Sequence, residues 1–334
     1  MTDKRITDNW NLAGHNWAVD MLKKHVVNGA TRHAYLFAGP PGLGRRTLAL
    51  RFAQALNCSS PTEPGIPCGQ CRDCKQIEST KHPDLTIIEA DTEGGTLKVD
   101  QIREARRTLT FKPYQSKYRV ALFLRFGEAN DNAANALLKT LEEAPSYAVL
   151  ILTADNPEQL LPTIVSRCEV LRLRPLRVEE VQRELENRRL ENSRAKLIAH
   201  ISGGRMGYAL RLIENDSLLD KREERLNDLL TLVSASRVEK FKYADQLSKD
   251  KDAMRQTITF WLSYWRDVML RAAQAETPLV NVDRNVEIED IAGGMDLSSA
   301  RRAVLRLEQG LEQLERNVNP RLLAETLLMD LPKI

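Results

Sequence analysis

The sequence predicts an α/β domain built on a parallel sheet, followed by a part of the chain that is helical throughout. Short apolar runs alternate with stretches of helical periodicity up to about residue 174, and this alternation is typical of a parallel sheet covered on both faces. A glycine-rich loop directly follows the first apolar run. Beyond residue 174 apolar residues recur almost everywhere with the helical period.

The elements of the predicted sheet domain follow from these patterns in order. We expect helices at Leu12–Asn28, Thr47–Leu56, Val99–Leu109 and Ala133–Glu143. We expect strands at His33–Ala38, Leu85–Glu89, Tyr118–Leu124 and Ala148–Leu152. The strand, the glycine-rich loop and the helix around residues 33–56 occur in the order that a phosphate-binding loop requires.

Length and charge bound the class of protein. A chain of 334 residues predicts two or three domains. Its 49 basic and 46 acidic residues give a net charge of only +3, which excludes a strongly basic nucleic-acid-binding protein but allows a local basic face. The chain has no apolar run of about 18 residues, and Met1–Asn9 is polar. We therefore expect a cytoplasmic protein.

The glycine-rich loop carries the spacing of a P-loop but not its chemistry. Gly39, Gly42 and Gly44 are placed so that backbone N–H groups can surround a phosphate. Arg45 stands where the lysine of a P-loop reaches the β- and γ-phosphates, and Arg46 replaces the hydroxyl that binds Mg²⁺.

Thr47 follows one residue later, about 100° further around the helix. We expect that it cannot substitute for the missing hydroxyl. The two arginines make the loop electropositive and leave open that it binds an anion. We predict that the loop holds no functional ATP and Mg²⁺ site.

Four cysteines predict a structural metal site. They have the spacing C-x₉-C-x₂-C-x₂-C, at Cys58, Cys68, Cys71 and Cys74. In a cytoplasmic protein this pattern indicates Zn²⁺, and four thiolate ligands leave no open position for catalysis. A disulfide pair and an iron–sulfur cluster are the alternatives. Cys168 stands alone and reads as a small buried side chain.

The degraded P-loop followed at once by four cysteines resembles the clamp-loader subunits of bacterial DNA polymerase III, which are AAA+ proteins. Three further stretches agree with this resemblance, namely Asn135–Glu143, Ser166–Cys168 and Asn317–Arg321. The likeness covers most of the chain and is strongest over residues 12–175. It implies an AAA+ P-loop domain with a zinc insertion, a helical lid and an all-α collar.

The resemblance also shows which residues of an ATPase are missing. The family's Asp-Glu pair, which orients Mg²⁺ and the attacking water, falls on Leu124 and Arg125. Glu128 and Asp131 lie nearby, and we interpret them as surface charges or as part of a helix cap. The lid arginine falls on Gly207, and Arg205 is a possible replacement.

These losses are similar to those of the non-hydrolysing delta prime type of the family rather than the ATP-hydrolysing gamma/tau type. In clamp loaders the arginine of the Ser-Arg-Cys motif reaches the γ-phosphate held by the neighbouring subunit. The resemblance assigns this trans arginine finger to Arg167, and a guanidinium suits the task because it is always charged and can bind phosphate bidentately. A structural ion pair is the alternative.

The resemblance divides the chain into residues 1–172, the AAA+ domain; 173–215, the lid; and 216–334, the collar. In the family the collar joins five subunits into a ring, so the implied partners are gamma/tau and delta subunits, the sliding clamp and primer-template DNA. We expect collar helices at 218–234, 237–247, 255–275, 296–317 and 320–331. One apolar helical face there is interpreted as domain core or, less simply, as a subunit contact: Trp261, Leu262, Trp265, Val268 and Met269.

DNA contact is suggested by a basic group after the cysteines, at Arg103, Arg106, Arg107, Lys112 and Lys117. Such a group is either a solvated face or a site of phosphate contact without sequence specificity. Two other classes of function stay open. One is an active gamma/tau-like ATPase in which Arg45, with Thr47 or Glu128, supplies the missing chemistry. The other is a zinc-bearing nucleic-acid-binding protein outside the clamp loader.

Overall fold

The computed structural model describes residues 8–92, 94–316 and 318–332. Most of the polar N-terminus, and Asn317 of the Asn317–Arg321 stretch, lie outside the described residues. The chain forms two compact units. The first runs to Leu176 and includes Arg205–Tyr208, and the second comprises Arg177–Gly204 and the chain from Ala209 onward. The division into three domains stays a prediction.

A five-stranded parallel sheet forms the centre of the first unit, as predicted. Its strands are β1 (Ala34–Ala38), β2 (Leu85–Ile88), β3 (Arg119–Phe123), β4 (Ala148–Ala154) and β5 (Glu169–Arg172). They lie in the order β2-β3-β4-β1-β5, and each neighbouring pair is parallel. Every residue of β1 and β4 is buried, which explains why these strands are continuous apolar runs rather than alternating ones.

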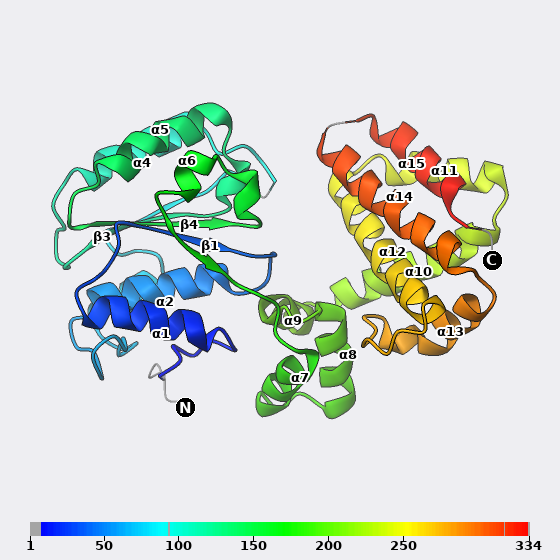
Figure 1. The fold of residues 1–334 in the computed structure, drawn as a ribbon, viewed down its shortest axis with the longest axis horizontal. Helices are drawn as coiled ribbons and strands as arrows, with labels where there is room; N and C mark the ends of the chain where they lie inside the picture. Colours follow the sequence, from blue (N-terminus) through cyan, green and yellow to red (C-terminus); the bar gives the residue numbers. More distant parts are fainter. Residues whose placement is uncertain (1–7, 93, 317, 333–334) are drawn as a thin grey trace. The chain divides into compact units, whose positions relative to one another are not determined.

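Helices cover both faces of this sheet (Figure 1). Helices α1 (Asn16–Val27) and α2 (Arg45–Asn57) lie on one face, and α4 (Val99–Leu109), α5 (Asp131–Glu142) and α6 (Pro162–Val165) lie on the other. Because side chains alternate along a strand, β1 contributes to both cores. Tyr35 and Phe37 join the cluster on the α1 and α2 side, whereas Leu36 joins the opposite one.

The element boundaries differ from the prediction at a few places. Helix α2 begins at Arg45 rather than Thr47, so both arginines of the loop belong to its first turn. Strand β5 was not expected, because its four residues begin and end with a charged side chain. Helix α3 (Arg72–Glu78) lies within the cysteine segment and was not expected either.

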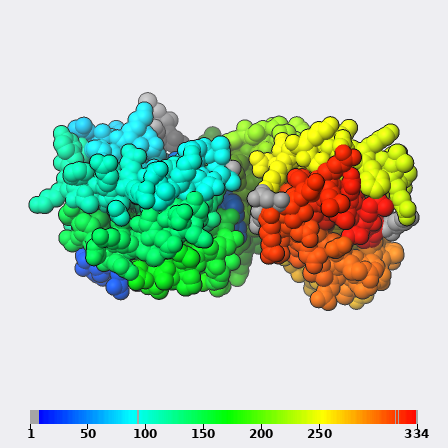
Figure 2. Space-filling view, turned by 90° about the horizontal axis from the view of Figure 1, so that it is seen from above, coloured from blue at the N-terminus to red at the C-terminus, as the bar shows by residue number. Residues whose placement is uncertain are grey.

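The second unit is helical throughout the residues that the structure describes, as expected. Its elements are α7 (Val178–Asn187), α8 (Asn192–Ser202), α9 (Met206–Glu214, which begins in the first unit), α10 (Ser217–Ser234), α11 (Arg237–Leu247), α12 (Lys251–Ala272), α13 (Asn285–Gly293), α14 (Leu297–Glu315) and α15 (Pro320–Asp330). Helices α7, α8 and α9 lie in the segment predicted only as a helical lid, and α13 lacks a counterpart in the prediction. Figure 2 shows α14 and α15, in orange and red, side by side at the surface.

The apolar face of α12 forms the core of this bundle. Trp261, Trp265 and Val268 are buried, and Leu262 and Met269 pack against the same cluster. The interpretation of this face as domain core is confirmed. Among the described residues, the structure contains no helix that is long and apolar enough to cross a membrane.

Candidate functional site

The glycine-rich loop connects β1 to α2 and has the backbone conformation that its glycines allow. Gly39, Gly42 and Gly44 have φ angles of 146°, 86° and 90°, in the region that side chains rarely adopt. A Cβ atom on Gly39 would lie 2.6 Å from the Leu173 carbonyl oxygen. Gly44 forms the N-cap of α2, and its carbonyl accepts the Leu48 N–H at 2.8 Å. The predicted strand, loop and helix context is confirmed.

The arginine in the lysine position is already paired within the protein. Arg45 is buried, and its Nη1 atom lies 2.7 Å from Oδ1 of the half-exposed Asp155, which directly follows β4. Arg45 and Arg46 open a helix that has no acidic residue in its first turn, an arrangement that the helix dipole disfavours. The Asp155 carboxylate offsets this charge, so a phosphate would have to compete with it. Arg46 and Thr47 are exposed.

Backbone atoms of the loop also take part in internal hydrogen bonds. The Gly207 N–H donates to the Gly42 carbonyl at 2.7 Å. A Cβ atom on Gly207 would lie only 2.9 Å from the same oxygen, so this position cannot carry an arginine in the arrangement seen here. Arg205 instead lies over the Tyr208 ring, 4.7 Å from its centroid.

His15 contacts the loop at Leu43. The side chain is buried, and Nε2 lies 3.1 Å from the Leu43 carbonyl oxygen, which fits an imidazole that donates its Nε2–H. Burial lowers the pKa of His15, and the hydrogen bond to the Leu43 carbonyl opposes this effect only in part. The loop is therefore packed against a neutral histidine.

Leu124 and Arg125 directly follow β3, where the resemblance places the Asp-Glu pair of the family. Leu124 is buried, and Arg125 has a left-handed backbone with a φ angle of 49°. The Arg125 Nε donates to Glu128 at 2.9 Å, and Nη1 lies 3.3 Å from Glu89. Glu128 Oε1 also accepts the Gly94 N–H at 3.0 Å. Glu128 thus serves as the partner of a cation.

The segment after Arg125 leads into α5 through a polar cap. Asn130 is the N-cap residue, and its side chain accepts the Ala133 N–H at 2.9 Å. Asp131 occupies the first turn of the helix, where a negative charge is favourable. The interpretation of this region as a helix cap is correct, with Asn130 rather than Asp131 as the capping side chain.

Arg167 lies between α6 and β5 with about a third of its side chain exposed, at 35%. Its Nη1 donates to the Thr163 carbonyl at 2.9 Å, and its Nη2 donates to Glu142 at 2.6 Å. The side chain is therefore accessible and held by an ion pair at the same time. Both sequence-based interpretations of Arg167 agree with this geometry.

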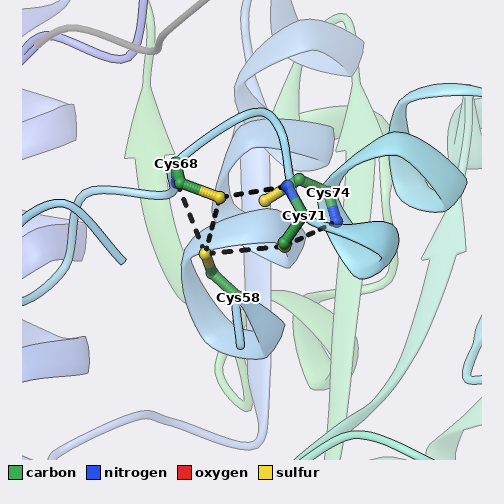
Figure 3. Close-up of side chains that lie close together, drawn as sticks. All are labelled: Cys58, Cys68, Cys71 and Cys74. Carbon is green, nitrogen blue, oxygen red and sulfur yellow. Dashed lines mark hydrogen bonds between the residues drawn. The ribbon is translucent and has the colours of Figure 1, made fainter. Parts of the chain in front are cut away.

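The four cysteines converge on one point, as Figure 3 shows. Their sulfur atoms all lie within 4.8 Å of one another. The Cys58 Sγ lies 3.6 Å from that of Cys68 and 3.9 Å from that of Cys71. Tetrahedral Zn²⁺ with bonds of about 2.3 Å requires sulfur separations of about 3.8 Å, so the cluster fits the metal. All five cysteines are free thiols, which disagrees with a disulfide pair.

The elements around the cluster explain its shape. Cys58 is the C-cap of α2, and Cys71 is the N-cap of α3, where its sulfur accepts the Cys74 N–H at 3.4 Å. The Cys68 sulfur similarly accepts the Cys71 N–H at 3.2 Å. Burial raises the pKa of Cys58 to about 11. Burial also acts on Cys71, but hydrogen bonds from Cys74 and Ser59 outweigh it and lower its pKa to about 6.

The basic group predicted for DNA contact is exposed. Its members extend from the outer face of α4 into the loop before β3: Arg103, Arg106, Arg107, Lys112 and Lys117. Cys168 is half-buried, and burial raises the pKa of its thiol to about 12. The sequence analysis did not find Asp155, Glu142 or Glu89 as partners of the arginines, because each lies far from its arginine along the chain.

Comparison with known proteins places the chain among replication proteins. The family described as "DNA polymerase III, delta subunit" matches residues 14–177, and its C-terminal counterpart matches residues 216–333. The chain belongs to the DNA polymerase III delta-subunit family. The two matches together span most of the sheet-containing unit and the long helices that follow α9.

Individual relatives agree with this membership. The chain is 29% identical to the DNA polymerase III subunit delta' of Bacillus subtilis, over 92% of this chain and 93% of the relative. It is 40% identical to the delta' subunit of Pseudomonas aeruginosa, over 41% of each chain. It is 33% identical to the tau subunit of Escherichia coli, over 61% of this chain but only 32% of that longer protein.

Proposed function

We propose that this clamp-loader subunit of DNA polymerase III does not hydrolyse ATP itself and donates Arg167 to the ATP site of a neighbouring subunit. In this role it resembles the delta prime type. The observation that carries the proposal is Arg125, a cation paired with Glu89 and Glu128 where an ATPase of the family would hold the carboxylate that positions the attacking water.

The glycine-rich loop supports the same function. Arg46 offers no hydroxyl to Mg²⁺, and Arg45 is paired with Asp155. Gly207 stands at the position of the lid arginine, and its N–H is hydrogen-bonded to the Gly42 carbonyl. Metal ligand, water-positioning carboxylate and lid arginine are thus missing together. The loss of all of them is expected for a subunit whose P-loop domain is retained for its shape.

Arg167 is the ATPase element that this proposal retains. It is exposed enough to reach a partner, and an arginine finger supplied in trans accelerates phosphoryl transfer by about 10³- to 10⁵-fold. The partners in this proposal are gamma/tau and delta subunits, assembled into a five-membered ring through residues 216–334. The ring would act on the sliding clamp and on primer-template DNA in the cytoplasm.

The cysteine cluster belongs to this proposal as a structural Zn²⁺ site. Cys58, Cys68, Cys71 and Cys74 would hold the ion and fix α3 against the end of α2. Four thiolate ligands leave no position for a catalytic water. The Zn²⁺ ion would therefore stabilise the fold and would not take part in catalysis.

Two measurements test the proposed function. In a complex reconstituted with gamma/tau and delta subunits, Arg167→Ala should leave assembly intact and reduce ATP turnover, because one neighbouring site loses its finger. Unchanged turnover would contradict the assignment. The isolated protein should not turn over ATP, and turnover that Arg45→Ala abolishes would establish the gamma/tau-like alternative. Tight DNA binding by the isolated chain at moderate salt would favour a nucleic-acid-binding protein instead.

A further inference from the structure

The resting position of Arg167 is set by two acceptors from different elements. Its Nη2 donates to Glu142 at 2.6 Å and its Nη1 donates to the Thr163 carbonyl at 2.9 Å. Of these two acceptors, only the Glu142 carboxylate carries a full negative charge. Both outer nitrogens of the guanidinium are therefore engaged within the chain, although each keeps a second N–H. A guanidinium that reaches out to a phosphate on a neighbouring subunit must still leave the Glu142 carboxylate.

The position of Glu142 makes this pair more than a random surface contact. Glu142 is the last residue of α5, and a carboxylate at the C-terminus of a helix is disfavoured by the helix dipole. Arg167 neutralises this carboxylate in the resting state. When Arg167 turns to another anion, Glu142 is left unpaired at an unfavourable place, and its charge repels the incoming phosphate.

We propose that Glu142 is a positioning residue that restrains Arg167 and is displaced by the γ-phosphate of the neighbouring subunit. This inference rests on the proposed function of Arg167 as a trans arginine finger. The carboxylate sets how readily the guanidinium engages, while the phosphate contact itself supplies the acceleration.

The exposure of the two side chains limits the strength of the restraint. Glu142 is 50% exposed and Arg167 is 35% exposed, so water screens their attraction. Exposed ion pairs change an equilibrium by at most about fivefold. This is far less than the effect of an arginine finger. Glu142 therefore tunes engagement and does not block it.

The test uses the complex reconstituted with gamma/tau and delta subunits. Glu142→Gln keeps the size of the side chain and removes its charge. It should raise kcat/KM for the Arg167-dependent part of ATP turnover by about two- to fivefold. Glu142→Asp, with the charge on a shorter side chain, should give an intermediate value.

Glu143→Gln is the matched control, because Glu143 is exposed, is adjacent in sequence and caps the same helix end. It removes the same charge without touching the Arg167 pair and should leave turnover at the parental value. In an Arg167→Ala background, Glu142→Gln should have no effect, because the residue it releases is gone. A merely structural role of Glu142 would not produce this dependence.

The outcomes separate the two proposals. If Arg167→Ala lowers turnover while Glu142→Gln behaves like Glu143→Gln, the restraint is disproved and the finger stands. A decrease with Glu142→Gln, or an increase that persists without Arg167, also disproves the restraint. If Arg167→Ala leaves turnover unchanged, the proposed finger fails, and this inference fails with it. Thermal melts of each variant exclude unfolding as the cause.

Discussion

Arg45 shows how a single side chain can redirect a phosphate-binding loop. Its charge is the same as that of the lysine expected there, but the guanidinium is paired with Asp155, which directly follows β4. Arg125 and Arg167 are also paired with carboxylates, from Glu89 and Glu128 in one case and Glu142 in the other. At each of these positions the arginine forms an ion pair with a carboxylate of the same chain.

The pairing of Arg45 predicts a cost when Asp155 is neutralised. Asp155→Asn should lower the free energy of unfolding by about 1 kcal/mol, because a buried guanidinium loses its charged partner. The half-exposed position of Asp155 keeps the loss below that of a fully buried pair. Chemical denaturation measures it, with Glu143→Gln as a surface control. Equal stability of variant and parent would mean that solvent, rather than Asp155, balances Arg45.

His15 predicts a pH dependence of stability. Its pKa is lowered in the folded protein from the ordinary 6.5, so the unfolded chain binds the proton more tightly. Its stabilising contribution is complete above pH 6.5 and is lost as the pH falls below that value. Denaturation of the parent and of His15→Gln at pH 7.5 and 5.5 should show a steeper loss for the parent. Parallel losses in both proteins would contradict the assignment.

At the scale of elements, the local sequence pattern predicted the strands and the cysteine cluster, because these features depend on residues that are close together in the sequence. The runs at 34–38 and 148–154 are long and apolar enough to identify β1 and β4, and the spacing of four cysteines identified their cluster. Strand β5 was not predicted, because Glu169–Arg172 has only two apolar residues. It is stabilised by pairing with β1, a partner that no local signal reveals.

The cysteine cluster predicts that metal stabilises the elements around it. Removal of Zn²⁺ should lower the melting temperature of the first unit by at least about 5 °C, because metal binding and folding are coupled. Cys71→Ser should lower it similarly and abolish further sensitivity to chelator. Cys168→Ser, which changes a half-buried thiol outside the cluster, should retain the sensitivity. Melting curves that do not respond to chelator would exclude a structural metal.

At the scale of the whole molecule, the alternation of strands and helices predicted the sheet and the resemblance predicted the family, whereas the partners of the arginines depended on folding. Arg45 and Asp155 meet because β1 and β4 are adjacent and parallel, so their carboxyl ends lie at the same edge. Arg125 meets Glu89 because β2 and β3 are adjacent in the same way. Local sequence patterns show these residues but do not show which of them form ion pairs.

The same topology predicts that repairing the P-loop alone does not restore an ATPase. The double substitution Arg45→Lys and Arg46→Thr supplies the lysine and the hydroxyl, but β3 is still followed by Leu124 and Arg125. Mg²⁺ would lack its carboxylate ligand, and the attacking water would lack its positioning group. The isolated variant should therefore show no Mg²⁺-dependent ATP turnover above the parent.

The complex provides the complementary control for this variant. Reconstituted with gamma/tau and delta subunits, the repaired subunit should support the parental rate, because Arg167 is unchanged and lies outside the loop. Mg²⁺-dependent turnover by the isolated variant would show that Arg125, Glu89 and Glu128 can rearrange into a metal site. A fall in the rate of the complex would instead show that the loop takes part in subunit contact, since Arg45 or Arg46 would then be needed for more than the internal Arg45–Asp155 pair.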